Sequence, residues 1–188
     1  TPREAVERAR EDVQIATSLV ESRLLLGNSD VYSHYSDGMK TMFERRGAAM
    51  APAIVAERRK ERQQYGETVY LLEPNVKRSR GGLRDVQLLR WLWYIKAGAS
   101  DPDQLHTKGV LSKFDYRRLI SSQNFLLRVR NEIHFHAGEM CDGLNRAEQL
   151  RMAEFMKYRG REGMLPVEQF MRDYFHHTNH VWQLAHRL

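Results

Sequence analysis

The residues best suited to chemistry lie in one segment, from Leu72 to Asp85. A pair of glycines, Gly81 and Gly82, stands there before a predicted amphipathic helix, among cations that are Lys77, Arg78, Arg80 and Arg84. Glycine lets a ligand approach the main chain, and the first amides of a helix lack intrahelical acceptors. Such amides and cations attract phosphate. The segment therefore predicts an anion site that includes Asp85 at the helix start, and a sharp turn among solvated cations is the alternative.

A second polar group lies in a predicted long helix further along the chain. Arg130 and His134 are one turn apart and share a face, with Arg128 and Asn131 beside them. The arginines are suited to a nucleotide or an acidic partner. Pairing with carboxylates inside the protein is the alternative.

Histidines near the end of the chain also have a spacing that brings side chains together. Asp173, His177 and His180 fall on one helix face, as do His176 and His180. Zinc usually takes four ligands, and no fourth donor is apparent in the sequence. We therefore predict a polar surface and no metal site.

Composition limits the class of protein. The chain has 188 residues, of which 41% are hydrophobic, so it can bury one core or two small ones without disulfides. A single cysteine, Cys141, and the lack of a signal sequence or long apolar run indicate a cytoplasmic protein without membrane spans. A net charge of +6 favours an anionic partner. Nucleic acid is a poor candidate, because Trp91 and Trp93 fall at core positions and do not alternate with basic residues.

Capping signals and periodicity predict an all-α bundle of about six to eight helices, in a single helical domain over residues 1–188. One short extended segment, Thr68 to Leu72, leads into the loop that carries Gly81 and Gly82, hereafter the glycine loop. The basic run Arg58, Arg59, Lys60 and Arg62 is predicted to be a solvated face. The predicted helices run from Thr1 to Gly27, Asp30 to Gly47, about Pro52 to Tyr65, Leu83 to Lys96, Asp103 to Lys108, Ser112 to near Gly138, Asn145 to Tyr158, and Pro166 towards the C-terminus.

The glycine segment also carries a resemblance. Glu73-Pro74-Asn75-Val76-Lys77, then three residues, then Gly81-Gly82-Leu83-Arg84-Asp85 and an apolar helix with Trp91, resembles the protein-PII uridylyltransferase family of bifunctional uridylyltransferase and uridylyl-removing enzymes. Similarity extends upstream to Asp12–Asn28, where Ala16–Gly27 resembles the family segment that follows the nucleotidyltransferase core, and downstream to Arg128–His134 and Phe170–Phe175. It covers nearly the whole chain.

The resemblance implies an activity for the complete enzyme. Such an enzyme is bacterial and uses UTP with Mg²⁺ or Mn²⁺ to modify a tyrosine of the nitrogen-regulatory protein PII. This chain would be the helical domain that packs against the nucleotidyltransferase core. The core lies outside it, because Gly98-Ala99-Ser100-Asp101 is too compact for the core's glycine-serine turn and is predicted to cap a helix. The chain also lacks the adjacent His-Asp pair of the uridylyl-removing domain, so we expect the 188 residues alone to be inactive.

The resemblance also suggests residue roles. Lys77, Arg80 and the glycine amides would contact nucleotide phosphate, while Arg84 and Asp85 would fix the loop or bridge to the core. Arg80 departs from the proline or small neutral residue common before the glycines. Two alternatives remain, the helical domain of a related enzyme such as glutamine synthetase adenylyltransferase, and a non-catalytic interaction module that binds an acidic protein.

Overall fold

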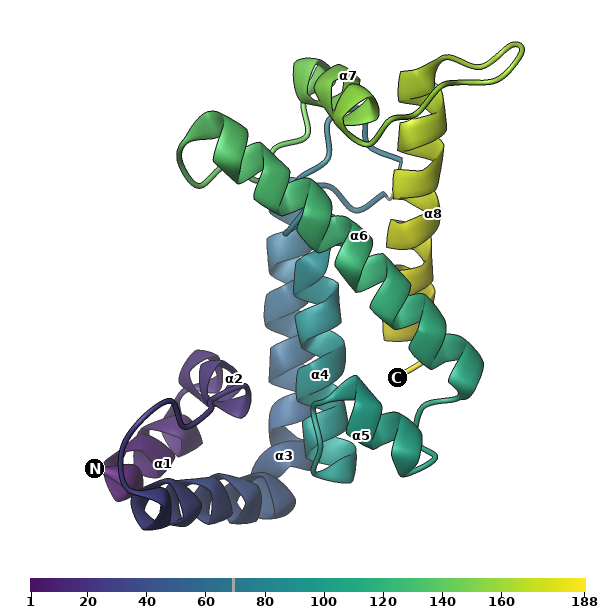
Figure 1. Cartoon of the computed structure of the whole chain (residues 1–188). Helices are drawn as coiled ribbons and strands as arrows, with labels where there is room; N and C mark the ends of the chain where they lie inside the picture. Colours follow the sequence, from purple (N-terminus) through teal and green to yellow (C-terminus); the bar gives the residue numbers. More distant parts are fainter. Residues whose placement is uncertain (69) are drawn as a thin grey trace. The chain divides into compact units, whose positions relative to one another are not determined.

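The computed structural model describes residues 1–68 and 70–188 (Figure 1). In this part of the chain there are eight helices and no strand, which confirms the all-α class. Val69, in the segment predicted to be extended, lies outside the described residues. No described helix has the length and apolar character needed to span a bilayer. The helices are α1 (Pro2–Glu11), α2 (Val13–Val20), α3 (Ser29–Tyr65), α4 (Leu83–Ala97), α5 (Pro102–Thr107), α6 (Lys113–Ala137), α7 (Arg146–Phe155) and α8 (Pro166–His186).

The chain divides into two compact units. Unit 1 comprises Thr1–Arg58 and Leu88–Ser112, and unit 2 comprises Arg59–Gln87 and Lys113–Leu188. Helices α3 and α4 therefore contribute residues to both units. The glycine loop and the second polar group both belong to unit 2.

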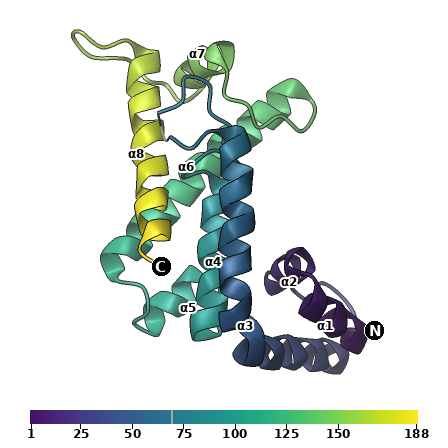
Figure 2. The same cartoon turned by 180° about the vertical axis from the view of Figure 1, so that it is seen from behind.

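Each unit has its own apolar interior. Unit 1 buries side chains of α1, α2, α3 and α4, including Val6, Ala16, Met42, Phe43 and Leu88. In unit 2, α8 packs against α6 and α7 (Figure 1, Figure 2). The fully buried side chains of unit 2 include Leu126, Ile133, Met152, Phe170 and Tyr174.

The prediction of one helix from Thr1 to Gly27 is wrong. Thr1 starts the helix as predicted, with a capping box that it forms with Glu4, but α1 ends at Glu11. Asp12 then takes an extended conformation, and its carboxylate accepts from the amides of Gln14 (2.7 Å) and Ile15 (3.0 Å), which starts α2. A side-chain cap competes with helix continuation in this way. Helix α2 ends at Val20, so Leu24 to Leu26 are not helical.

Two predicted helices are one helix, α3. Its first amides are capped by Asn28, whose side chain accepts from Asp30 N at 2.7 Å, so Asp30 is not the cap. Gly47 does not end the helix; a Cβ there would lie 2.8 Å from Cγ2 of Ile95, so glycine permits close packing on α4. Pro52 lies inside α3, and the helix bends in this part (Figure 1). Proline removes one helical hydrogen bond and typically kinks a helix.

Other helix starts agree with the sequence prediction, and one of these helices ends earlier than predicted. Helix α5 begins at an Asp101 cap, as predicted for the Gly98–Asp103 segment, with Oδ2 of Asp101 accepting from Gln104 N at 3.3 Å. Asn145 caps α7. That helix ends at Phe155, before the predicted Tyr158, and Lys157 follows with φ of 60°.

Two tyrosines of unit 2 provide a matched test of packing. Tyr174 is 1% exposed, and its hydroxyl has no hydrogen-bond partner among the described residues, whereas the Tyr158 hydroxyl donates to Asp173 at 3.0 Å. We expect Tyr174→Phe to raise the free energy of unfolding by about 1 kcal/mol, because a buried unpaired hydroxyl is removed. Tyr158→Phe should lower it by about 1 kcal/mol. Urea denaturation measures both, and a destabilised Tyr174→Phe variant would contradict this account.

Candidate functional site

The glycine loop is anchored within unit 2 at both ends. Asn75 forms an antiparallel bridge with Gly143, with Val76 N donating to Asp142 O at 2.8 Å. The Asn75 side chain accepts from the amides of Lys77 (3.1 Å) and Arg78 (2.7 Å). Such an Asx turn fixes the backbone locally. The loop is therefore a rigid part of the unit.

The loop amides that were predicted to bind phosphate donate instead to acceptors of the protein itself. Gly81 N donates to the Asp85 carboxylate at 2.7 Å. An anion site here consequently depends on side chains. The other pairs are Gly82 N to Ser79 O (2.9 Å), Leu83 N to Val76 O (3.1 Å), Arg84 N to Lys77 O (2.8 Å) and Asp85 N to Gly82 O (2.9 Å).

The glycines are required by packing. Gly81 has φ of +74°, and a Cβ on it would lie 2.0 Å from the carbonyl oxygen of Thr178 in α8. A Cβ on Gly82 would lie 2.6 Å from the Val76 carbonyl oxygen. No side chain fits at either position without a shift of backbone. Both residues are buried, so they bring the loop against α8 and against itself.

Asp85 fixes the loop, one of the two roles suggested by the resemblance. Its side chain is fully buried. Besides accepting from Gly81, it lies 3.8 Å from an Arg62 guanidinium nitrogen. A buried carboxylate needs such partners, because removing its hydration is costly. Asp85 therefore joins the start of α4, the glycine turn and the end of α3.

Arg78 and Arg84 are held by the protein. Both approach the Glu61 carboxylate of α3, with Nε–O distances of 3.5 Å for Arg78 and 3.6 Å for Arg84. Arg78 also donates to the Tyr65 hydroxyl and lies over its ring. Arg84 donates to Gln87 at 2.9 Å. These contacts leave both guanidiniums in structural roles here.

Arg80 is also engaged. Its guanidinium lies 3.7 Å from the centre of the Trp182 ring and donates to Glu67 O at 2.9 Å. Arg62 lies over the same ring at 4.8 Å. Cations are attracted to the face of an indole ring. Trp182 thereby ties the loop and α3 to α8.

Lys77 differs from these arginines. No described carboxylate lies within ion-pair distance of its ammonium group. Burial lowers the pKa of Lys77, and the charges of Arg84 and Arg130 lower it further, while Asp142 opposes them. Since a cation among cations favours the approach of an anion, Lys77 is the strongest candidate for a ligand contact.

The second polar group lies beside Lys77. Oδ1 of Asp142 accepts from Arg130 Nε at 2.6 Å and from His134 Nε2 at 3.0 Å. Burial raises the pKa of Asp142, but these hydrogen bonds outweigh it and hold the pKa below its usual range. The structure thus joins the two predicted groups into one, hereafter the Lys77 cluster, which comprises Lys77, Arg84, Arg130, His134 and Asp142.

The basic run in α3 is only partly a solvated face. Arg59 and Lys60 are exposed as predicted, but Arg58 is 3% exposed and the Arg62 side chain is 13% exposed. The prediction is wrong for Arg58 and Arg62. Arg62 is drawn inward by Trp182 and Asp85, residues that are distant in sequence.

The histidines of α8 make separate contacts. His177 Nδ1 lies 3.1 Å from Ser122 Oγ, and its ring stacks on Phe125. The rings of His176 and His180 are 3.9 Å apart. In the described part of the chain, no three His, Cys, Asp or Glu side chains are arranged to hold a metal ion.

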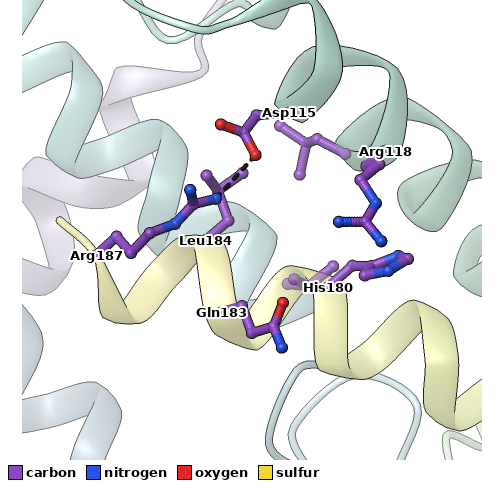
Figure 3. A pocket seen from close by; sticks show the side chains of 8 residues that line it. Asp115, Arg118, His180, Gln183, Leu184 and Arg187 are labelled. Carbon is purple, nitrogen blue, oxygen red and sulfur yellow. Dashed lines mark hydrogen bonds and ion pairs between the residues drawn. The ribbon is translucent and has the colours of Figure 1, made fainter.

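His180 lines a small polar pocket between α6 and α8 (Figure 3). Asp115 accepts from Arg187 there at 2.8 Å, and Arg118 and Gln183 complete its polar lining. The pocket holds about 20 Å³, which is room for water and too little for a nucleotide. It is therefore no alternative to the Lys77 cluster.

Sequence reasoning missed the acceptors that organise the site. The one-turn spacing of Arg130 and His134 indicates a shared partner, but many carboxylates were available. Asp142 becomes that partner only when the loop after α6 returns to bridge Asn75. Glu61 and Trp182 carried no distinctive local signal.

Two glycines with left-handed backbone provide a matched test of the loop. Gly81→Ala should lower the free energy of unfolding by about 3 kcal/mol or more, because the Thr178 backbone blocks the new Cβ. Gly138 has φ of +68° with no atom near its Cβ position, so Gly138→Ala should cost only about 1 kcal/mol. Denaturant melts test the difference. Equal losses would show that backbone strain alone matters.

The His180 site predicts a pH dependence of stability. Burial, followed by the charges of His176 and Arg118, lowers the pKa of His180 to about 4. An unfolded histidine titrates near 6.5, so between about pH 6.5 and 4 the unfolded chain binds a proton that the folded chain does not. The free energy of unfolding therefore decreases as the pH is lowered through this range. His180→Gln should make this fall of Tm shallower. A Tm profile identical to that of the parent chain would refute the assignment.

The chain is similar to proteins of one family. A family model described as GlnD PII-uridylyltransferase matches residues 50–188. The relatives include bifunctional uridylyltransferase/uridylyl-removing enzymes of Methylococcus capsulatus, 38% identical over 98% of the chain, and of Cereibacter sphaeroides, 32% identical over 98%. A Vibrio atlanticus enzyme of the same name is 32% identical over 96%. No solved structure matches the chain.

The chain spans only part of these relatives. It covers 20% of the Cereibacter sphaeroides enzyme and 21% of the other two. The predicted family is confirmed over most of the chain by the family model and over almost all of it by the relatives. The chain therefore belongs to the GlnD PII-uridylyltransferase family.

Proposed function

We propose that these residues are the helical domain of a bifunctional enzyme that transfers UMP from UTP to a tyrosine of PII and also removes it. The relatives carry this pair of activities in their name, and the chain matches about a fifth of their length. The transfer reaction uses Mg²⁺ or Mn²⁺ with UTP, in a bacterial cytoplasm. The metal ligands belong to the nucleotidyltransferase core, and the 188 residues alone are inactive.

Lys77 carries the proposal for this domain. Its ammonium is partly desolvated and lies near Arg84 and Arg130, with Asp142 as the nearby counter-charge. We propose that a phosphate group of UTP supplies the missing negative charge when the core places the nucleotide over this face. An ammonium contact to phosphate is strong when water is partly excluded.

The other members of the predicted site receive supporting roles in this proposal. Arg78, Arg80 and Arg84 hold the loop through Glu61 and Trp182, and the glycine amides hold its backbone. Arg130 and His134 position Asp142, which limits the excess positive charge beside Lys77. The nucleotide contact itself is assigned to Lys77.

The test uses the complete enzyme with Lys77→Ala. Loss of a charged phosphate contact should raise the KM for UTP roughly 10- to 100-fold, with the fold retained. Lys40→Ala is the matched control, because Lys40 is an exposed lysine of unit 1, and it should leave the KM unchanged. Initial rates of PII modification at varied UTP measure both. An unchanged KM in Lys77→Ala would remove Lys77 from the nucleotide site.

A further inference from the structure

The segment Arg23–Gly27 joins α2 to α3 (Figure 1). It exposes three consecutive leucines. Leu24 is 42% exposed, Leu25 80% and Leu26 95%. Apolar side chains so exposed in a row are unusual on a soluble surface and indicate a buried position in a larger assembly. None of the cations of the Lys77 cluster belongs to this segment.

Both ends of the segment are held in place. Before it, the Tyr32 hydroxyl donates to Ser22 O at 2.9 Å, and the Tyr35 hydroxyl donates to Leu19 O at 2.9 Å. After it, Asn28 caps α3. The leucines therefore stand on a short span with fixed ends.

Side chains of the segment alternate. Leu24 and Leu26 line a surface groove of unit 1 together with Val31 and Tyr32, whereas Leu25 does not line it. A period of two is typical of a β-strand, in which successive side chains point to opposite faces. Apolar residues on both faces are typical of a strand that is covered on both sides.

The main chain of the segment is available for pairing. Among the described residues, the amides and carbonyls from Arg23 to Gly27 make no hydrogen bond to another protein group. A row of unused donors and acceptors is what a strand offers to the edge of a sheet.

We propose that Arg23–Leu26 is a β-strand of the complete enzyme, added to the edge of a sheet that lies outside these 188 residues, with Gly27 (φ +125°) turning the chain towards α3. The described residues contain no strand, and the chain spans about a fifth of its relatives, so such a sheet has room only elsewhere in the protein. Leu24 and Leu26 would lie on one face of this strand, and Leu25 would pack on the opposite face. The proposal rests on the proposed function only in requiring a longer enzyme.

A second copy of the same segment is a weaker occupant. Two copies would form a two-stranded ribbon of four residues each, which is marginal in water. It would also leave one edge of each strand unpaired. The edge of an existing sheet supplies main-chain hydrogen-bond partners and an apolar face together.

Hydrogen exchange followed by mass spectrometry in the complete enzyme tests the proposal. The amides of Arg23–Leu26 that pair with the sheet should exchange at least about 100-fold more slowly than those of the exposed residues Glu139 and Met140 in the loop after α6, because strand pairing protects them. Exchange at the rate of that loop would overturn the proposal. Protection that disappears on dilution of the enzyme would overturn it in favour of pairing between copies.

A matched pair of variants separates burial in the sheet from general surface effects. Leu25→Asp should abolish the protection and lower the Tm of the complete enzyme, since a carboxylate would replace a buried leucine. Met140→Asp is the control, because Met140 is 89% exposed in unit 2, and it should change neither. Equal effects of both variants would overturn the strand assignment. These readouts do not involve UTP, so the Lys77 assignment stands or falls separately.

Discussion

The buried carboxylate of Asp85 is the constraint on which the glycine loop depends. A carboxylate without water requires compensating hydrogen bonds and charge, and Asp85 obtains them from the Gly81 amide and from Arg62. The Gly81 amide can reach it only if the backbone turns through a positive φ. Arg62 in turn lies over the Trp182 ring, over which Arg80 also lies. One buried charge therefore determines the turn, the end of α3 and the contact with α8.

This arrangement also determines where a ligand can be recognised. The first amides of a helix normally attract anions, and Asp85 in the first turn of α4 already takes advantage of that field. The preceding loop folds back so that its carbonyls accept from the same amides. The backbone amides of the loop are thereby already hydrogen-bonded within the protein. Charge that is left for a ligand must come from side chains, and the arginines of the loop are committed to Glu61 and Trp182.

Local signals predicted much of this structure. The helix starts at Thr1 and Asn145 were predicted correctly, because a cap is made by residues only two or three positions away. Gly47 and Pro52 were misread as helix ends. Their effect depends on packing, since Gly47 faces Ile95 and the helix continues past Pro52 with Met50 and Ile54 buried on either side. In the candidate site, Asp85 was predicted at the helix start as part of an anion site, but its pairing with the Gly81 amide reversed the expected use of that amide. Contacts with Thr178 and Asp142 could not be found from spacing at all.

Lys77 is the residue that a purely structural account of the loop leaves unexplained. The guanidiniums of Arg78, Arg80 and Arg84 each contact an aromatic ring, a carboxylate or a carbonyl. A planar guanidinium is suited to such contacts. Lys77 instead presents a compact ammonium to a surrounding in which burial and neighbouring cations both disfavour its charge. A neutral side chain would remove that electrostatic cost without breaking a side-chain hydrogen bond or ion pair among the described residues, and Asn75 would still hold the loop backbone. An anion that binds beside Lys77 would offset the same cost. The electrostatics of the Lys77 cluster are therefore better explained by an anion-binding role than by a purely structural one.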